Sequence, residues 1–509
     1  MIIVSLTGPS LHDVLRQIAV SAPFADMFEF RLDLISRPNI SRLLDETLSY
    51  RTGRGMRTIA TCRPVWEGGG FSGNEADRIE ILESASLLGV DFIDIELQSG
   101  RAILAEFLRR QKETKVIVSL HLGGPTKINI AGVYAKMHAT GAEVVKLAYM
   151  AHDSSDNRHA FEFLSLARAD RRKAIAIAMG EFGEPSRILY KKFGGWGTYA
   201  ATEDGMGAAP GQIPASHLKK VYRADRLNAT TKVYGVIGNP VRQSKGIYIH
   251  NPLLKRARKN AVYCRFPVNN LGRFITHIAP LLQGFSVTMP FKKDVLRYLD
   301  GVEQSAKKIG AVNTILRRRG KLLGTNTDGP GALDAIESVV RVRKKTMLIV
   351  GAGGAARAIA YEAKRRGAEV LITNRTEKKA QLLSRRFGLT HLPIAQIGIT
   401  PFDILVNATS VGMAPRIDET PVPKEILKNK VVFDAVYNPQ VTRLLREATE
   451  MGAEIIQGTE MYLNQAARQF RLYTGIKPKI RAMRKFFDEQ PEKRPHGNPL
   501  SVNSWAVRT

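Results

Sequence analysis

Two lysines stand in sequence contexts that could each support an enzymatic reaction. Lys146 ends an apolar run, and it is preceded along the chain by His121 and by Glu67 in a glycine-rich loop. A lysine with an acid–base histidine has the parts for imine chemistry on a ketone. Lys292 ends the run Val-Thr-Met-Pro-Phe-Lys and is followed by Asp328 in Asn-Thr-Asp-Gly and by a glycine-rich turn, the parts for hydride transfer with a nicotinamide. The chain is therefore predicted to be two enzymes joined end to end.

Length, charge and cysteine content narrow the class of protein. A chain of 509 residues exceeds one ordinary core, so two or three domains are expected. The net charge of +29 invites a nucleic-acid interpretation, but the basic clusters are short, scattered and not interleaved with aromatic residues. Only two cysteines are present, the N-terminal residues read as a β-strand, and no run approaches the roughly 20 apolar residues that span a bilayer. A soluble, cytoplasmic protein without membrane or nucleic-acid partners is expected.

The first 214 residues alternate short apolar runs with helix-length segments. This pattern predicts a closed (β/α)8 barrel. Chemistry in such barrels is built at the C-terminal ends of the strands, where Glu29, Arg31, Arg63, His121 and Lys146 fall. The predicted strands are Ile2–Leu6, Met27–Arg31, Thr58–Cys62, Phe92–Glu96, Lys115–Ser119, Glu143–Ala148, Ala174–Met179 and Thr198–Ala201.

The remainder of the chain is predicted to form a second enzyme with two lobes. Residues 215–231 lack periodicity and are interpreted as a linker. An α/β substrate lobe is expected over 232–330 and a Rossmann nucleotide-binding lobe over 331–457, with a strand at Thr346–Val350. C-terminal helices over 458–487 are expected to return to the substrate lobe, and residues 488–509, with three prolines, are expected to be disordered.

The residues around Lys146 indicate the course of a reaction. At the end of an apolar strand, burial favours the neutral amine, which can attack a ketone and form a Schiff base. His121 could then act as general acid and base on the substrate carbon and hydroxyl. Glu67 is suited to orient that histidine. A solvated lysine and a structural histidine are the alternatives when either residue is taken alone.

Seven motifs in the N-terminal region together resemble type I 3-dehydroquinate dehydratase. They are Glu29-Phe30-Arg31-Leu32-Asp33, Thr61-Cys62-Arg63, Glu67-Gly68-Gly69, His121, Lys146, Ser186-Arg187 and Ala209-Pro210-Gly211-Gln212. The resemblance implies that Lys146 carries a covalent imine during turnover, His121 is the general base and acid, and Glu67 is its partner. It also implies that the substrate is bound by Arg187, Gln212, Glu29, Arg31 and Arg63.

Two positions depart from this family's pattern. Ala208 stands where the family usually has a serine, four residues before the glutamine. Weaker substrate binding or loop closure is expected there, without loss of chemistry. Leu122 follows the histidine where an acidic residue is frequent.

The glycine-rich turn after the Thr346–Val350 strand is typical of dinucleotide binding. Gly351, Gly353, Gly354 and Ala355 lead from the strand into a predicted helix, whose N-terminus suits a pyrophosphate. The next strand ends in Asn374-Arg375-Thr376. An arginine at this place suits the 2′-phosphate of NADP, whereas NAD would need an acidic residue. The alternative is an arginine that simply faces solvent.

The segments around this turn resemble shikimate dehydrogenase. They include Gly238-Asn239-Pro240, Val287–Lys292, Gly310–Thr314, Asn326–Gly329, Asn407–Met413, Asp434–Pro439 and Asn464–Ala467. The resemblance implies a catalytic pair of Lys292 and Asp328 and no metal. It also implies substrate contacts from Ser244, Thr288, Asn313, Tyr437 and Gln465, and cofactor contacts from Thr409 and Met413 beside those of the glycine turn and Asn374-Arg375-Thr376.

One departure affects the expected substrate. The family has two serines that flank one residue and precede a proline, and these serines bind the substrate carboxylate. This chain keeps Ser244 but has Gly246 and Ile247 at the other two places. The loss of one hydroxyl donor predicts a modestly raised KM, since one neutral hydrogen bond is worth roughly 0.5–1.5 kcal/mol. The glycine could instead make room for quinate, which carries an extra hydroxyl on that carbon.

The sequence thus predicts a bifunctional α/β enzyme of aromatic biosynthesis. The barrel would dehydrate 3-dehydroquinate to 3-dehydroshikimate, and the second half would reduce that product to shikimate with NADPH. Three alternatives stay open. The second half could act mainly as a quinate dehydrogenase, or one half could be a non-catalytic binding module. The third alternative is a second role in nucleic-acid binding through the basic surface.

Overall fold

A computed structural model describes residues 1–35, 56–123, 128–203 and 207–489. By its internal contacts the chain divides into two compact units. Unit 1 holds Met1–Ile247 and Leu254–Leu282, and unit 2 holds Tyr248–Leu253 and Gln283–Gln490. No helix among the described residues is long and apolar enough to cross a membrane.

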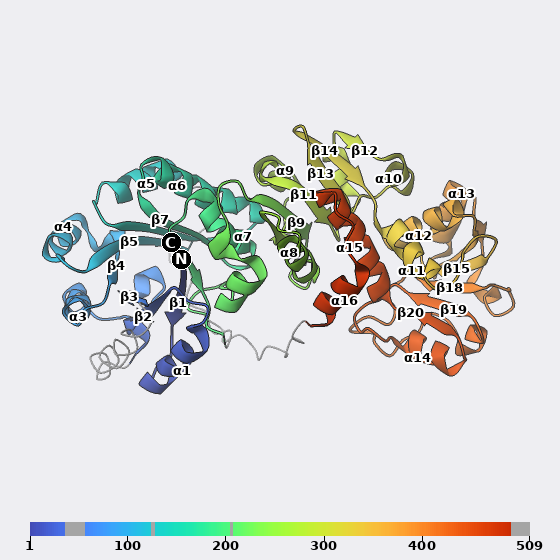
Figure 1. Cartoon of the computed structure of the whole chain (residues 1–509), viewed down its shortest axis with the longest axis horizontal. Coiled ribbons are helices and arrows are strands. Elements are labelled where there is room, and N and C mark those ends of the chain that lie inside the picture. The colour runs from blue at the N-terminus through green and yellow to red at the C-terminus, as the bar shows by residue number, and fades with distance from the viewer. Residues whose placement is uncertain (36–55, 124–127, 204–206, 490–509) are drawn as a thin grey trace. The chain divides into compact units, whose positions relative to one another are not determined.

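The N-terminal sheet of unit 1 confirms the predicted barrel. Its eight strands pair in parallel in the order β7-β6-β5-β4-β3-β2-β1-β8, and the two end strands also contact each other. Figure 1 shows the barrel helices on the outside of these strands. The strands are β1 (Ile2–Leu6), β2 (Met27–Arg31), β3 (Arg57–Thr61), β4 (Phe92–Glu96), β5 (Lys115–Leu122), β6 (Val144–Met150), β7 (Lys173–Met179) and β8 (Thr198–Ala200). The helices are α1 (Leu11–Ser21), α3 (Glu75–Leu87), α4 (Arg101–Arg110), α5 (Ile130–His138), α6 (Asn157–Ala169) and α7 (Glu184–Leu189).

The barrel strands are held by an apolar interior. Ile3, Ile59, Ile117 and Ile175 come from four of the strands and form part of one buried cluster. Strand β5 extends to Leu122 rather than to the predicted Ser119, so His121 lies within the last residues of the strand. The register pairs Ser119 with Lys146 and His121 with Ala148 on β6. The barrel thus fixes the backbones of the predicted catalytic residues.

Unit 1 also contains residues beyond the predicted linker. The linker includes a π-helical segment, η9 (His217–Tyr222), followed by β9 (Lys232–Gly238), which pairs in parallel with β10 (Ala261–Pro267). Helix α9 (Leu271–His277) begins where the buried carboxylate of Asp153, from the loop after β6, accepts hydrogen bonds from the backbone N–H groups of Asn269 (2.7 Å) and Asn270 (2.9 Å). These contacts explain why β9, β10 and α9 group with the barrel. The predicted domain boundaries stay predictions.

Unit 2 contains a mixed sheet and a parallel sheet. In the mixed sheet, β11 (Leu282–Val287) and β14 (Lys321–Thr325) flank β13 (Thr314–Arg318) in antiparallel pairing, and β12 (Gly301–Val302) runs parallel to β14. The parallel sheet has the order β17-β16-β15-β18-β19-β20, as in a Rossmann lobe. Its strands are β15 (Thr346–Val350), β16 (Glu369–Thr373), β17 (Thr390–His391), β18 (Ile404–Asn407), β19 (Val431–Asp434) and β20 (Glu454–Ile456).

Helices cover both faces of the parallel sheet. Met347 and Ile349 belong to one buried cluster, and Leu348 and Val350 belong to another, as expected for strands buried on both faces. The helices of this part of the chain are α8 (Gly246–Arg256), α10 (Gln304–Ile309), α11 (Asp328–Glu337), α12 (Gly354–Arg365), α13 (Glu377–Phe387), α14 (Arg443–Glu450), α15 (Gly458–Thr474) and α16 (Ile480–Asp488). The predicted disordered tail lies outside the described residues from position 490 onward.

Candidate active sites

The first candidate site is built around Lys146, which is the third of the seven residues of β6 and not at the strand end where it was expected. Lys146 on β6 is buried, and its Nζ lies 2.8 Å from Asp94 Oδ2 on β4 and 3.6 Å from Glu29 Oε1 on β2. The same nitrogen sits 4.0 Å from the centre of the Tyr199 ring on β8. Four strands therefore enclose one amine with two carboxylates and an aromatic face.

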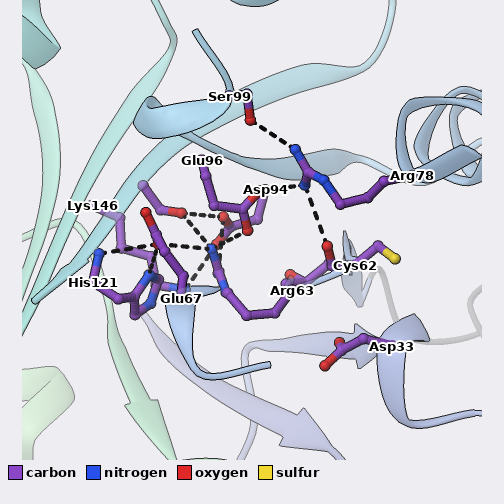
Figure 2. Close-up of polar contacts among 12 residues, drawn as sticks. Asp33, Cys62, Arg63, Glu67, Arg78, Asp94, Glu96, Ser99, His121 and Lys146 are labelled. Carbon is purple, nitrogen blue, oxygen red and sulfur yellow. Dashed lines mark hydrogen bonds and ion pairs between the residues drawn. The ribbon is translucent and has the colours of Figure 1, made fainter. Parts of the chain in front are cut away.

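His121 and Glu67 form a pair beside this lysine (Figure 2). Glu67 Oε2 lies 2.7 Å from His121 Nδ1 and accepts a hydrogen bond from the His121 backbone N–H at 3.1 Å. Glu67 is carried by η4 (Val65–Glu67), which ends at Gly68 with a φ of 77°. Because Nδ1 is engaged, Nε2 is the ring nitrogen left to act on a substrate.

Burial sets the proton affinities of this pair. Burial raises the pKa of Glu67 to about 8, although the Arg63 guanidinium opposes the shift. Burial also lowers the pKa of His121 well below its usual value, and the cations Arg63 and Lys146 add to that effect. The histidine is therefore neutral at neutral pH, and its Nε2 can remove a proton when Glu67 is ionised and accepts the hydrogen on Nδ1.

A buried network that the sequence reasoning missed supports these groups. Arg63 lies 3.0 Å from Asp94 Oδ1, pairs with Glu96 and donates to Ser119 Oγ at 2.8 Å. Ser119 Oγ in turn donates to Asp94 Oδ1 at 2.6 Å. Although burial alone would raise it, Arg63 and Lys146 hold the pKa of Asp94 below its usual range.

The sequence carried a signal for this network. Asp94 and Glu96 alternate with isoleucines in the otherwise apolar strand β4. Two carboxylates two residues apart in a buried strand point to the same face, so they need partners inside the barrel. Figure 2 shows Glu96 between Arg63 and Arg78.

The other predicted barrel residues occupy different parts of this site. Arg31 is buried and binds Asp33, with Nη2 at 2.6 Å from Oδ2. Arg187 is buried and donates to the carbonyl oxygens of Tyr199 and Pro210, both at 3.2 Å, and burial lowers its pKa to about 9. Gln212 accepts from the backbone N–H of Ala208 at 2.9 Å. Arg187 and Gln212 thus hold the loop in which the family's serine is replaced by Ala208.

The second candidate site lies in unit 2 around Lys292. Its Nζ lies 2.6 Å from Asp328 Oδ2, the first residue of α11. Asn313 donates from Nδ2 to Asp328 Oδ1 at 2.7 Å and to Thr327 Oγ1 at 3.0 Å. Thr327 Oγ1 is 3.5 Å from Gln465 Oε1 on α15. Predicted residues from four separate segments therefore meet in one hydrogen-bonded group.

Close helix packing brings α15 to this group. A Cβ on Gly331 of α11 would lie 2.7 Å from the Gln465 backbone nitrogen, so only glycine permits this approach.

Thr288 follows β11 directly, and its carbonyl oxygen accepts from the Phe291 N–H at 3.1 Å. Tyr437 follows β19, with its ring centre 5.2 Å from that of Tyr462 on α15.

Ser244 belongs to unit 1, where the Arg265 guanidinium donates to its carbonyl oxygen at 2.7 Å. A Cβ added to Gly246 would meet Tyr263 Cε1 at 3.2 Å and Ser244 Oγ at 3.4 Å. Gly246 was expected to open space, but the direction in which a side chain would point is already lined by Tyr263. The room gained there is small.

The turn between β15 and α12 fits a dinucleotide. Gly351 has a φ of 120°, and a Cβ there would approach the Ala408 carbonyl oxygen at 2.9 Å. A Cβ on Gly353 or Gly354 would meet nothing within 4 Å, and no side chain caps the N-terminus of α12. Backbone N–H groups at an uncapped, open helix N-terminus suit a pyrophosphate.

The remaining predicted cofactor residues lie near the ends of β16 and β18. Arg375 and Thr376 are exposed, and Asn374 donates to the Thr376 carbonyl oxygen at 2.9 Å. Thr409 donates from Oγ1 to Asn407 Oδ1 at 2.7 Å, and Met413 is exposed in the same loop. Because Arg375 is exposed, its guanidinium is accessible to an anionic group.

Comparisons with known proteins identify both halves. Residues 2–229 match the family model of type I 3-dehydroquinase. Residues 236–315, 334–442 and 458–485 match models of the shikimate dehydrogenase substrate-binding domain, of shikimate/quinate 5-dehydrogenase and of the shikimate 5′-dehydrogenase C-terminal domain. A chloroplastic bifunctional 3-dehydroquinate dehydratase/shikimate dehydrogenase of Arabidopsis thaliana is 40% identical over 480 residues, which cover 89% of this chain and 78% of the relative.

The chain belongs to the bifunctional 3-dehydroquinate dehydratase/shikimate dehydrogenase family.

Two further relatives support this assignment for the whole chain and for its second half. The shikimate biosynthesis protein AroDE of Chlamydia pneumoniae is 30% identical and spans 93% of this chain and 95% of the relative. An NADP(+) shikimate dehydrogenase of Pyrococcus abyssi is 41% identical over 258 residues, which cover 50% of this chain and 96% of the relative. Lys146 lies in the region that matches type I 3-dehydroquinase. Lys292 lies in the region that matches the substrate-binding domain of shikimate dehydrogenase.

Proposed function

We propose that the barrel dehydrates 3-dehydroquinate to 3-dehydroshikimate and that the second half reduces 3-dehydroshikimate to shikimate with NADPH. The observation that carries this proposal is the meeting of Lys146 with the His121–Glu67 pair in one barrel mouth, within a chain whose second half pairs Lys292 with Asp328. An amine beside a neutral imidazole is suited to imine-assisted elimination. A lysine held by a carboxylate is suited to proton transfer at a carbonyl oxygen.

The dehydration is assigned to Lys146 and His121. The free amine of Lys146, formed when the ammonium passes a proton to water, attacks the substrate ketone. Loss of water with return of that proton leaves a protonated imine. The imine draws electrons from the adjacent C–H bond, and His121 Nε2 removes that proton to leave an enamine. The enamine expels the neighbouring hydroxyl, which leaves as water with the proton returned by His121. Hydrolysis of the conjugated imine then restores Lys146 and releases 3-dehydroshikimate.

The network around the lysine has a defined part in this scheme. Asp94 and Glu29 hold Lys146 Nζ in place through their carboxylates, and the Tyr199 ring packs against the same nitrogen. Glu67 fixes the orientation of His121 through Nδ1. Contacts of Arg31, Arg63, Arg187 and Gln212 with the substrate remain proposals that rest on the family resemblance.

The reduction is assigned to Lys292 and Asp328. NADPH supplies the hydride when it is bound. The Lys292 ammonium donates a proton to the substrate oxygen as the carbonyl is reduced, and Asp328 holds the ammonium in place. Asn313 binds Asp328 Oδ1 and so fixes the carboxylate. Substrate contacts from Ser244, Thr288, Asn313, Tyr437 and Gln465 are proposed on the same resemblance.

Shikimate is preferred over quinate in this proposal because Tyr263 lines the space beside Gly246. A cytoplasmic location is also proposed, supported by two cysteines that are both buried and free. The proposed partners are the small-molecule substrates, and the scattered basic clusters are not assigned to a nucleic acid.

A coupled assay tests both activities in one chain. Wild type, Lys146→Ala and Lys292→Ala are each supplied with 3-dehydroquinate and NADPH, and absorbance is followed at 340 nm. Wild type is expected to consume NADPH and both variants to fail. Added 3-dehydroshikimate should rescue only Lys146→Ala. Failure of wild type to reduce added 3-dehydroshikimate would contradict the assignment of the second half.

A further inference from the structure

Asp434 is a buried carboxylate to which the proposed mechanism gives no role. It ends β19 with no exposed surface. Its partners are neutral groups: Oδ1 accepts from Asn407 Nδ2 at 2.9 Å and from the Val436 N–H at 3.0 Å, and Oδ2 accepts from Thr442 Oγ1 at 2.6 Å. Among the described residues, no lysine, arginine or histidine forms an ion pair with it. A buried carboxylate without a cation is costly, and burial raises the pKa of Asp434 to about 6 in spite of its three donors.

One partner of Asp434 holds the predicted cofactor loop. Asn407 Oδ1 accepts from both the backbone N–H (3.0 Å) and the hydroxyl (2.7 Å) of Thr409. Asn407 Nδ2 also donates to the Val411 carbonyl oxygen at 3.2 Å. The amide must face one way to serve these groups, and the acceptor Asp434 stabilises that orientation. The loop from Thr409 to Met413 is therefore tied to Asp434 through Asn407.

The other two partners hold the loop that carries Tyr437. Val436, which donates its N–H to Asp434, is the residue before Tyr437. Thr442 is the N-cap of α14, where its hydroxyl accepts from the Leu445 N–H at 3.4 Å. One carboxylate thus binds both ends of the segment from Val436 to Thr442. The register pairs Asn407 with Asp434 on adjacent strands, so the two loops leave the sheet side by side.

We propose that Asp434 is a positioning residue of the dehydrogenase, which fixes the cofactor loop Thr409–Met413 and the Tyr437 segment relative to each other by accepting three hydrogen bonds. This inference rests on the proposed function, since the roles of Thr409, Met413 and Tyr437 come from it. The residue acts through its acceptor geometry and not through its charge. An amide oxygen at Oδ1 could still serve Asn407 and Val436, while its NH2 group faced the Thr442 hydroxyl.

The test uses the full-length chain with Asp434→Ala, Asp434→Asn and the control Asp403→Ala. Asp403 lies before β18 at the opposite end of the sheet, where it binds the Thr346 N–H at 2.9 Å and is not part of either loop. Binding of NADP+ is measured directly by calorimetry, and KM and kcat for shikimate are measured separately. Dehydratase activity of the same sample reports whether the barrel is intact.

Asp434→Ala is expected to raise both the Kd for NADP+ and the KM for shikimate by at least about tenfold, as expected when more than one hydrogen bond is lost. Dehydratase activity should stay within about twofold, since Asp434 belongs to unit 2 and the barrel residues belong to unit 1. Asp434→Asn and Asp403→Ala should bind NADP+ like wild type. Wild-type binding and KM in Asp434→Ala, or equal impairment of Asp434→Asn, would overturn the proposal.

A second variant covers the case in which Asp434→Ala leaves the dehydrogenase unfolded. Thr442→Val removes the Thr442 donor to Asp434 together with the N-cap acceptor of α14, and it leaves the hydrogen bonds from Asn407 and Val436 to Asp434 in place. It should therefore raise the KM for shikimate and leave the Kd for NADP+ near that of wild type. No change in this KM would contradict the positioning role. If wild type itself fails to bind NADP+, the proposed function is wrong, whatever the variants show.

Discussion

The two lysine sites differ in how deeply the lysine side chain is buried and in how many groups contact it. Lys146 is enclosed by carboxylates from two strands and by the Tyr199 ring, with 5% of its side chain exposed. Lys292 has one carboxylate partner, Asp328, and 26% of its side chain is exposed. An amine that must become covalently attached needs a dry, fixed position, whereas an amine that only passes a proton can lie at the edge of an open cleft. The difference in burial thus follows the difference in proposed chemistry.

This contrast predicts different stability effects when each lysine loses its carboxylate. Asp94→Asn leaves Lys146 and Arg63 buried with less compensation and should destabilise unit 1 by about 3–5 kcal/mol, as for other broken buried pairs. Asp328→Asn breaks a partly exposed pair and should cost no more than about 1 kcal/mol. Thermal unfolding of both variants measures the difference. Equal shifts in Tm would remove the distinction between the two sites.

The pH dependence of the barrel reaction tests the pairing of His121 with Glu67, which has no counterpart beside Lys292. Burial raises the pKa of Glu67 to about 8. A protonated Glu67 would donate to His121 Nδ1 and leave a proton on Nε2, which could then not act as a base. We therefore expect dehydratase kcat/KM to rise with pH up to about 8. Glu67→Gln should have a lower dehydratase kcat/KM that no longer depends on pH in this range. A wild-type kcat/KM that is flat between pH 6 and 9 would argue against the assignment of Glu67 as the partner of His121.

The smallest expected effect concerns Gly246. Gly246→Ser restores a hydroxyl donor worth roughly 0.5–1.5 kcal/mol, so the KM for shikimate should fall by no more than about tenfold. Contact with Tyr263 at 3.2 Å offsets part of this gain. Ratios of kcat/KM for shikimate and quinate in wild type and variant measure the effect. If wild type prefers quinate and Gly246→Ser prefers shikimate, the second half is mainly a quinate dehydrogenase.

Much of the fold could be predicted because the hydrophobic patterns of strands and helices are clear along the chain. Apolar strands followed by helices predicted the barrel, and the strand–glycine turn–helix pattern predicted β15 and α12 at their observed places. The strand-end prediction is confirmed for His121 on β5 but is wrong for Lys146, which is the third of the seven residues of β6, and Glu67 lies in η4. Such inferences succeed where strand order alone places residues together.

Other features depend on contacts that no local pattern contains. Nothing near Asp153 indicates that it binds Asn269 and Asn270, so the grouping of β9 and β10 with the barrel was not foreseen. The space beside Gly246 depends on Tyr263 from another strand. Asp94 and Glu96 were a recognisable signal, but their partner Arg63 was assigned only to the substrate pocket.

Chemical trapping of the imine tests most directly the claim that the two lysines perform different chemistry. The full-length enzyme is incubated with 3-dehydroquinate, reduced with sodium borohydride, digested and mapped by mass spectrometry. We predict a stable substrate-derived adduct on Lys146, none on Lys292, and loss of the adduct in Lys146→Ala. An adduct on Lys292, or dehydration of 3-dehydroquinate by Lys146→Ala at the wild-type rate, would contradict this claim.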